Sequence, residues 1–211
     1  MTTRTRSRLE PAQGRDDELR VRRGAVRFLA IPAHRFVALD GEGPPTPDAF
    51  EARMPGLYAT AYAAHFALKR RGLEARVGPP EGVWWTATGA TSPDDVFGAD
   101  RTLWRWTLMI ALPDEATDAD LHDARTAGAA RLDPEVARSL RVEPFEEGDV
   151  AQLLHVGPYS EERASVERLH AEVQGAGYAL RGRHHELYLG DPRRSSPDRL
   201  RTILRHAVAP A

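Results

Sequence analysis

Three polar side chains at alternate positions of one short segment have the chemistry of a binding or catalytic site. They are His184, Glu186 and Tyr188, within a run from residue 184 to residue 189 that ends at Gly190-Asp191-Pro192. The composition of this run predicts a strand, and alternation along a strand places the three side chains on one face. A carboxylate beside a phenol can hold a cation or transfer a proton.

Two interpretations of this face fit the pattern. In the first, Leu187 and Leu189 face the core while the three polar side chains face water. In the second, the Glu186 face lines a concave ligand site. The strand pattern alone does not choose between them.

Metal binding is weakly supported here. His184 and His185 both neighbour Glu186, but adjacent strand residues point to opposite faces, so that only His184 and Glu186 can share an ion. The sequence also contains no phosphate-binding glycine loop and no serine nucleophile elbow. We therefore expect no metal and no cofactor.

A strand, a turn and a helix precede the Glu186 segment. Residues 150–156 form an apolar run that ends at Gly157-Pro158-Tyr159. The following helix is expected to begin at Ser160 and to end near Gly175, with its apolar stripe at Val166, Leu169 and Val173. Tyr159 at the turn is the second candidate catalytic residue, as a hydrogen-bonding partner of Glu186.

The first half of the chain has a similar order of elements. Strands are expected at residues 28–31 and 35–39, a helix from Pro47 to about Arg71, and strands at 83–86 and 103–112. A helix over 117–132 and a strand over 136–145 follow. Because the two halves share the order strand, turn, helix, strand, the C-terminal run Leu200–Val208 is predicted to be a strand as well.

This internal repeat predicts an α+β fold made of duplicated βαββ units, with two main helices, antiparallel sheet and a central ligand cleft. The two pseudo-repeats span about residues 24–113 and 139–211, within a single domain over 24–211. Residues 1–23 are arginine-rich and unpatterned, which predicts a flexible basic arm.

All four tryptophans lie between Trp84 and Trp106, on two consecutive predicted strands. An indole needs a partner for its N–H when it is buried, and clustered indoles therefore suit a half-open aromatic pocket. Ordinary core packing is the alternative. Aromatic faces each attract a cation by about 0.5 to 2 kcal/mol.

Composition limits the function. The 211 residues carry 29 basic and 31 acidic side chains, no cysteine, and no apolar run that could span a bilayer. Because basic and acidic residues are mixed along the chain, the sequence indicates no general basic surface for nucleic acid or for an anionic membrane. We expect a cytoplasmic protein without direct nucleic-acid or membrane binding, present as a monomer or homodimer.

Three motifs resemble one known family. The runs at residues 154–159, 186–192 and 200–205 look like the GyrI-like small-molecule-binding domain, which is related to the effector domains of AraC-type and MerR-type multidrug regulators. Residues 37–43 and 77–85 resemble a standalone branch of this family. The likeness covers about residues 26–208, and the chain lacks the DNA-binding domain of the transcription factors.

The resemblance implies a cleft for flat, often cationic molecules, with a buried glutamate at the position of Glu186. The implied ligand-binding set is Tyr58, Tyr62, Trp84, Trp85, Trp104, Trp106, Tyr159, Glu186 and Tyr188.

Three functions follow as hypotheses. The first is sequestration of aromatic or cationic xenobiotics. The second is hydrolysis of the cyclopropane of DNA-alkylating natural products, in which burial would raise the pKa of Glu186 so that it protonates a substrate carbonyl or positions water, with Tyr159 or Tyr188 as a hydrogen-bonding assistant. The third is a protein-interaction role, as in a topoisomerase-inhibiting relative.

Overall fold

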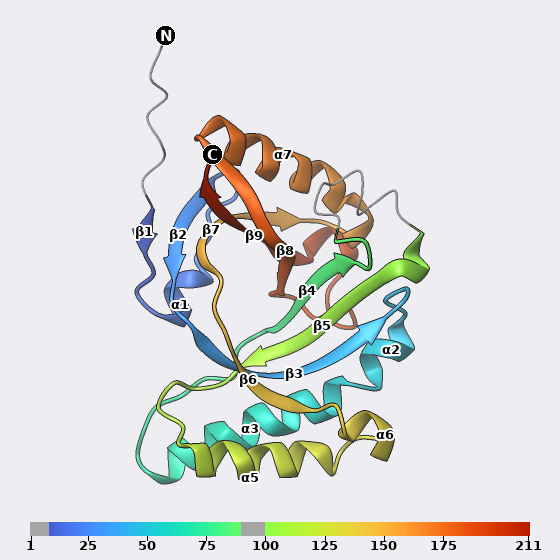
Figure 1. Cartoon of the computed structure of the whole chain (residues 1–211). Coiled ribbons are helices and arrows are strands. Elements are labelled where there is room, and N and C mark those ends of the chain that lie inside the picture. Colours follow the sequence, from blue (N-terminus) through green and yellow to red (C-terminus); the bar gives the residue numbers. More distant parts are fainter. Residues whose placement is uncertain (1–8, 90–99) are drawn as a thin grey trace. The chain divides into compact units, whose positions relative to one another are not determined.

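The computed structural model describes residues 9–89 and 100–211, which fold as two compact units (Figure 1). Among the described residues, the first unit is drawn from residues 9–32, 83–89, 100 and 146–211, and the second from residues 33–82 and 101–145. Each unit thus combines segments from both halves of the chain, and the unit boundaries do not coincide with the boundaries of the predicted repeats.

The first unit is built on sheet strands in the hydrogen-bonded order β1-β2-β7-β9-β8-β4. Their bounds are β1 Glu10–Pro11, β2 Val26–Ile31, β7 Gly148–Val156, β9 Arg201–Pro210, β8 Tyr178–Tyr188 and β4 Pro80–Thr86, of which residues 83–86 belong to this unit. β1 runs parallel to β2, whereas the β2–β7, β7–β9 and β8–β9 pairs are antiparallel. The helical segments are α1 (Arg15–Glu18), η2 (Tyr159–Glu161), α7 (Glu162–Gly175) and η3 (Pro197–Arg199).

Helix α7 lies on one face of this sheet and contacts β7, β8 and β9 (Figure 1). Its buried residues Val166, Leu169 and Val173 are those of the predicted apolar stripe. They join a core with Phe28, Ala151, Leu153, Tyr178, Leu204 and Val208. Because each such side chain stabilises the fold by about 1.5 to 3 kcal/mol when buried, this core fixes the position of α7 over β8.

The second unit has three antiparallel strands in the order β5-β3-β6. The strands are β3 His34–Glu42, β5 Trp104–Ala111 and β6 Arg141–Phe145, with helices α2 Pro47–Glu51, α3 Met54–Arg70, α5 Asp118–Ala129 and α6 Pro134–Ala137, and a 3-10 turn η1 at Arg101–Leu103. Helices α3 and α5 lie side by side (Figure 1). They approach closely at Gly128, where a Cβ atom would stand 2.7 Å from the backbone oxygen of Gly56.

Two sequence predictions in this unit need correction. The helix predicted from Pro47 to Arg71 is two helices, which end at Glu51 and begin again at Met54, because Pro55 has no backbone N–H with which to continue the hydrogen bonds of α2. The strand predicted over 136–145 is wrong in its first part. Asp133 accepts a hydrogen bond from the Glu135 amide and begins α6, so that the strand starts only at Arg141.

The predicted flexible arm also differs from the structure in its described part, residues 9–23; residues 1–8 lie outside the described residues. β1 pairs with β2, and the Glu18 side chain in α1 is fully buried. The Gln152 side chain donates a hydrogen bond to the Glu18 backbone oxygen at 2.8 Å, and Arg27 forms a 2.9 Å ion pair with Asp17. These contacts depend on residues far along the chain, which local composition does not reveal.

The predicted fold class is confirmed. The fold is α+β and mostly antiparallel, with α3 and α7 as the two predicted main helices. The C-terminal run is strand β9, as the internal repeat predicts.

We predict that Gly128→Ala destabilises the protein by about 1 to 3 kcal/mol, as overpacking does. The added methyl group would lie 1.9 Å from Thr60 Oγ1 and against the backbone of α3, which cannot move aside cheaply. Urea denaturation followed by circular dichroism measures the change. Gly175→Ala is the matched control, since its Cβ meets nothing within 4 Å and alanine favours a helix by about 1 kcal/mol at most. Equal behaviour of the two variants would contradict close packing at Gly128.

Candidate functional site

The Glu186 carboxylate is held at both oxygens by neighbours on its own strand. Tyr188 Oη donates a hydrogen bond to Glu186 Oε2 at 2.8 Å, and His184 Nε2 lies 3.1 Å from Glu186 Oε1. An ionised carboxylate only accepts, so His184 donates from Nε2 in this arrangement. The three side chains share one face of β8, as alternation predicts. They do not face bulk water, since the Glu186 side chain is only 15% exposed and His184 10%.

A second aromatic residue extends this chain of hydrogen bonds. Trp84 on β4 donates from Nε1 to Tyr188 Oη at 3.1 Å, and Tyr188 donates in turn to Glu186. Burial, followed by the nearby charge of Glu186, raises the pKa of Tyr188 well above its ordinary value. Tyr188 therefore keeps its proton and remains a donor, which fixes the direction of the relay.

Tyr159 lies at the exposed end of the group. Its ring meets the Tyr188 ring edge to face, with centroids 5.9 Å apart, and the residue is 40% exposed. Burial of the hydroxyl and the carboxylates of Glu162, Glu186 and Asp191 raise the pKa of Tyr159 to about 12. Tyr159 is thus a protonated phenol that reaches solvent, which suits a residue met first by an entering ligand.

Glu162 is a fourth polar member that the sequence did not single out. It begins α7, it is buried, and it interacts electrostatically with Glu186. Burial and the negative charge of Glu186 raise the pKa of Glu162 to about 9, while the Thr202 hydroxyl acts in the opposite direction. A signal was present, because Glu162 precedes Val166 by four residues and continues the stripe of α7 toward its N-terminus.

His184, which contacts Glu186, belongs to a cluster of three histidines in the first unit. His206 on β9 stands opposite His184 in the strand register, and its ring centroid is 5.2 Å from that of His170 on α7. Burial and the neighbouring imidazoles lower the pKa of His206 to about 3 and the pKa of His170 to about 4. Both are therefore neutral at physiological pH and leave the charge of Glu186 uncompensated.

The other aromatic candidates make local contacts. Trp85 on β4 is covered by the Arg183 guanidinium, 3.7 Å from the ring centroid. In the second unit, Trp106 is 1% exposed, donates to the Gly43 backbone oxygen at 3.2 Å and packs against Phe50. The structure thus brings Trp84, Tyr159, Glu186 and Tyr188 together, and it places Trp106 in a local core.

The remaining three aromatic candidates also lie in the second unit. Arg101 stands 5.5 Å from the Trp104 ring centroid. On α3, Tyr62 is 48% exposed and lies 6.3 Å from both the Tyr58 and Phe66 rings, measured between ring centroids. Tyr58, Tyr62 and Phe66 thus form an aromatic row along α3.

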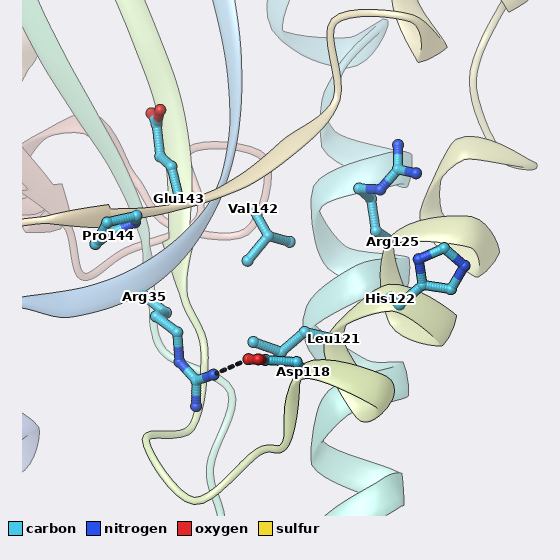
Figure 2. Close-up of a pocket in the computed structure, with 8 residues that line it drawn as sticks. All are labelled: Arg35, Asp118, Leu121, His122, Arg125, Val142, Glu143 and Pro144. Atoms are coloured by element: carbon cyan, nitrogen blue, oxygen red, sulfur yellow. Dashed lines mark hydrogen bonds and ion pairs between the residues drawn. The ribbon is translucent and has the colours of Figure 1, made fainter.

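Two surface hollows occur in the second unit. One of about 280 Å³ lies between α5, β3 and β6, where Arg35 and Asp118 form a 3.3 Å ion pair across its edge (Figure 2). The other, about 600 Å³, lies between α3 and α5 and includes Tyr62. Among the described residues, no group of three or more acidic or histidine side chains is arranged to hold a metal ion. In the same residues, no helix is long and apolar enough to cross a membrane.

The strands and helices define an α+β domain with a mostly antiparallel sheet. The chain belongs to the family of GyrI-like small-molecule-binding domains, whose model matches residues 25–207. The family predicted from the three motifs is confirmed.

Solved structures agree with this assignment. An uncharacterized conserved protein from Listeria innocua is 28% identical, with a TM-score of 0.77 over 95% of this chain and all of its own. A hydrolase from the same organism is 27% identical, with a TM-score of 0.72 and the same coverage. The C-terminal domain of EcmrR, 10% identical with a TM-score of 0.56 over 89% of this chain and 98% of its own, shares the fold. No match was found among curated proteins.

We predict that acidification destabilises the protein through the buried histidines. Because the pKa values of His206 and His170 in the folded protein lie below the value of about 6.5 in an unfolded chain, the unfolded state binds protons first as the pH falls. Stability is then full above about pH 6.5 and declines toward pH 4. Urea denaturation at several pH values should show a smaller decline in His206→Gln than in the wild type. His122→Gln, at an exposed position, is the control and should keep the full decline. An unchanged pH dependence in His206→Gln would contradict the prediction.

Proposed function

We propose that this protein is a hydrolase that adds water to the cyclopropane of DNA-alkylating natural products in which the strained ring is conjugated to a dienone. The observation that carries the proposal is the Glu186 carboxylate, held at both oxygens and partly open to solvent. The similarity to a hydrolase from Listeria innocua over the whole of that chain supports the same class of activity.

The geometry suits water addition. With Oε2 fixed by Tyr188 and Oε1 by His184, Glu186 can orient a water molecule and take its proton without first reorganising. The water oxygen bonds to the cyclopropane methylene, the strained carbon–carbon bond breaks, and its electron pair moves through the ring to the dienone oxygen, which takes up a proton and becomes a phenol. Formation of the aromatic ring favours the products, so the protein needs mainly to place the reactants and to transfer protons.

The aromatic neighbours supply the placement. Tyr159 and Tyr188 present rings at right angles, and Trp84 is anchored through its N–H. Such faces accept flat aromatic molecules by stacking and edge contacts. Tyr159 adds a protonated hydroxyl at the entrance, which can donate a hydrogen bond to the substrate.

We predict that Glu186→Gln lowers kcat for such a substrate by about 100-fold or more, the usual contribution of a general base. The amide keeps the shape of the side chain but cannot accept the proton of water. Loss of the dienone absorbance on incubation with the purified protein measures turnover. Glu172→Gln makes the same change at an exposed position of α7 and should match the wild type. Undiminished turnover in Glu186→Gln would remove this residue from the mechanism.

A second candidate function is sequestration of aromatic cations without turnover. It is favoured by one observation: in the described residues no arginine or lysine pairs with Glu186, while the rings of Trp84, Tyr159 and Tyr188 adjoin it. A desolvated carboxylate attracts a cation, and each aromatic face adds about 0.5 to 2 kcal/mol. The cytoplasmic location, the monomer or homodimer state and the lack of direct nucleic-acid binding stay predictions from the sequence.

We predict that an aromatic cation such as ethidium binds the wild type more tightly than Glu186→Gln, by about 10-fold, since one charge–charge attraction is lost. Fluorescence titration measures both dissociation constants. An uncharged molecule with a similar fused-ring skeleton is the control and should bind the two proteins equally. If ethidium also binds both equally, the carboxylate does not select for charge.

A further inference from the structure

Glu162 is a buried acid that has no role in the addition of water by Glu186. It is the first residue of α7, and only 5% of it is exposed. Its Oε1 atom is buried and has no hydrogen-bond partner among the described residues. Buried polar atoms are nearly always hydrogen-bonded, so an oxygen left unpartnered beside a candidate site points to a missing ligand group.

The surroundings of Glu162 come from three elements. The Thr202 hydroxyl hydrogen-bonds to the Glu162 side chain, and Glu162 interacts electrostatically with Glu186 and Tyr188 of β8 and with Tyr159 of η2. From β9 comes Thr202, which stands opposite Tyr188 in the strand register and does not titrate. The acid therefore adjoins the same rings and the same carboxylate that would hold the substrate.

Two adjacent buried carboxyl groups cannot both be ionised without strong repulsion, and the hydrogen bonds decide which one carries the charge. Glu186 has Tyr188 and His184 at its two oxygens, and it retains some exposure to water. Glu162 has an unpartnered oxygen and is more deeply buried. The proton therefore resides on Glu162, because burial and the negative charge of Glu186 raise the pKa of Glu162 to about 9.

We propose that Glu162 is the proton donor of the hydrolase, paired with Glu186 as the proton acceptor. This inference rests on the proposed function and assigns its second catalytic group. When the substrate enters, its dienone oxygen becomes the missing partner of the Glu162 carboxyl group.

Glu186 and Glu162 together account for every proton that is transferred in the reaction. Glu186 takes one proton from water as the oxygen–carbon bond forms and the cyclopropane bond breaks. Glu162 gives its proton to the dienone oxygen, which receives the electron pair and becomes the phenol. One water is consumed, no other reactant is needed, and the proton then passes from Glu186 back to Glu162, directly or through a water molecule, before the next turnover.

The test is kinetic and spectroscopic. Glu162→Gln should lower kcat by about 100-fold or more with KM little changed, because the amide keeps the shape but is a far weaker acid. In the wild type, kcat should fall as the pH rises through the pKa of Glu162, about 9. Infrared difference spectra at pH 7 should show a protonated carboxyl band that is absent from Glu162→Gln and retained in Glu186→Gln. Glu161→Gln, the exposed neighbour, is the matched control and should behave as the wild type in all three measurements.

The outcomes separate this inference from the proposed function. If the wild type hydrolyses the substrate and Glu162→Gln does so equally well, Glu162 is not the donor and the hydrolase assignment stands. If the wild type does not turn over the substrate, both the proposed hydrolase function and the role of Glu162 as proton donor are contradicted. If activity is lost but the infrared band persists in Glu162→Gln, the proton is held elsewhere and the assignment to Glu162 is overturned. Thermal unfolding of the variant verifies that a loss of activity is not a loss of folding.

Discussion

One interaction organises the candidate site: the buried carboxyl group of Glu162, in the first turn of α7, interacts electrostatically with the Glu186 carboxylate on β8. The helix dipole would favour an ionised Glu162 by about 0.3 to 1 kcal/mol. An unpaired buried charge costs several kcal/mol even after relaxation. The second effect is the larger, and it places the single negative charge on Glu186, where Tyr188 and His184 can hydrogen-bond to it. The core that fixes α7 over β8 is thus also what keeps one of the two acids protonated.

On the opposite face of β8, a buried acid is paired with cationic side chains. There Glu147 pairs with Arg205 at 2.9 Å and with His185 at 3.0 Å. Although burial opposes ionisation, these two cationic partners hold the pKa of Glu147 below its usual range. On that face, the charge of Glu147 is neutralised within the protein, and the ion pairs have a structural role. On the Glu186 face, no arginine or lysine among the described residues pairs with the carboxylate, which leaves it available to a ligand or a substrate.

The sequence predicted those features that depend on local pattern and on the repeat. Alternation placed His184, Glu186 and Tyr188 on one face, the stripe of α7 was correct, and the repeat identified β9 as a strand. Glu162 was missed because an acid in the first turn of a helix is ordinarily solvated, although its position four residues before Val166 continues the buried stripe of α7. Residues 9–23 were mistaken for an arm, since their order derives from contacts with Arg27 and Gln152.

The same electrostatics bears on the choice between hydrolysis and sequestration. Binding a cation needs the charge of Glu186 and the aromatic rings, and a second, neutral carboxyl group adds almost nothing to that attraction. Burying this group with an unpartnered oxygen costs about 1 to 3 kcal/mol in stability. A reaction in which an oxygen atom gains electron density uses the same group directly, because a neutral acid supplies a proton where the charge develops. The presence of Glu162 therefore favours chemistry at this site over simple retention of a cation.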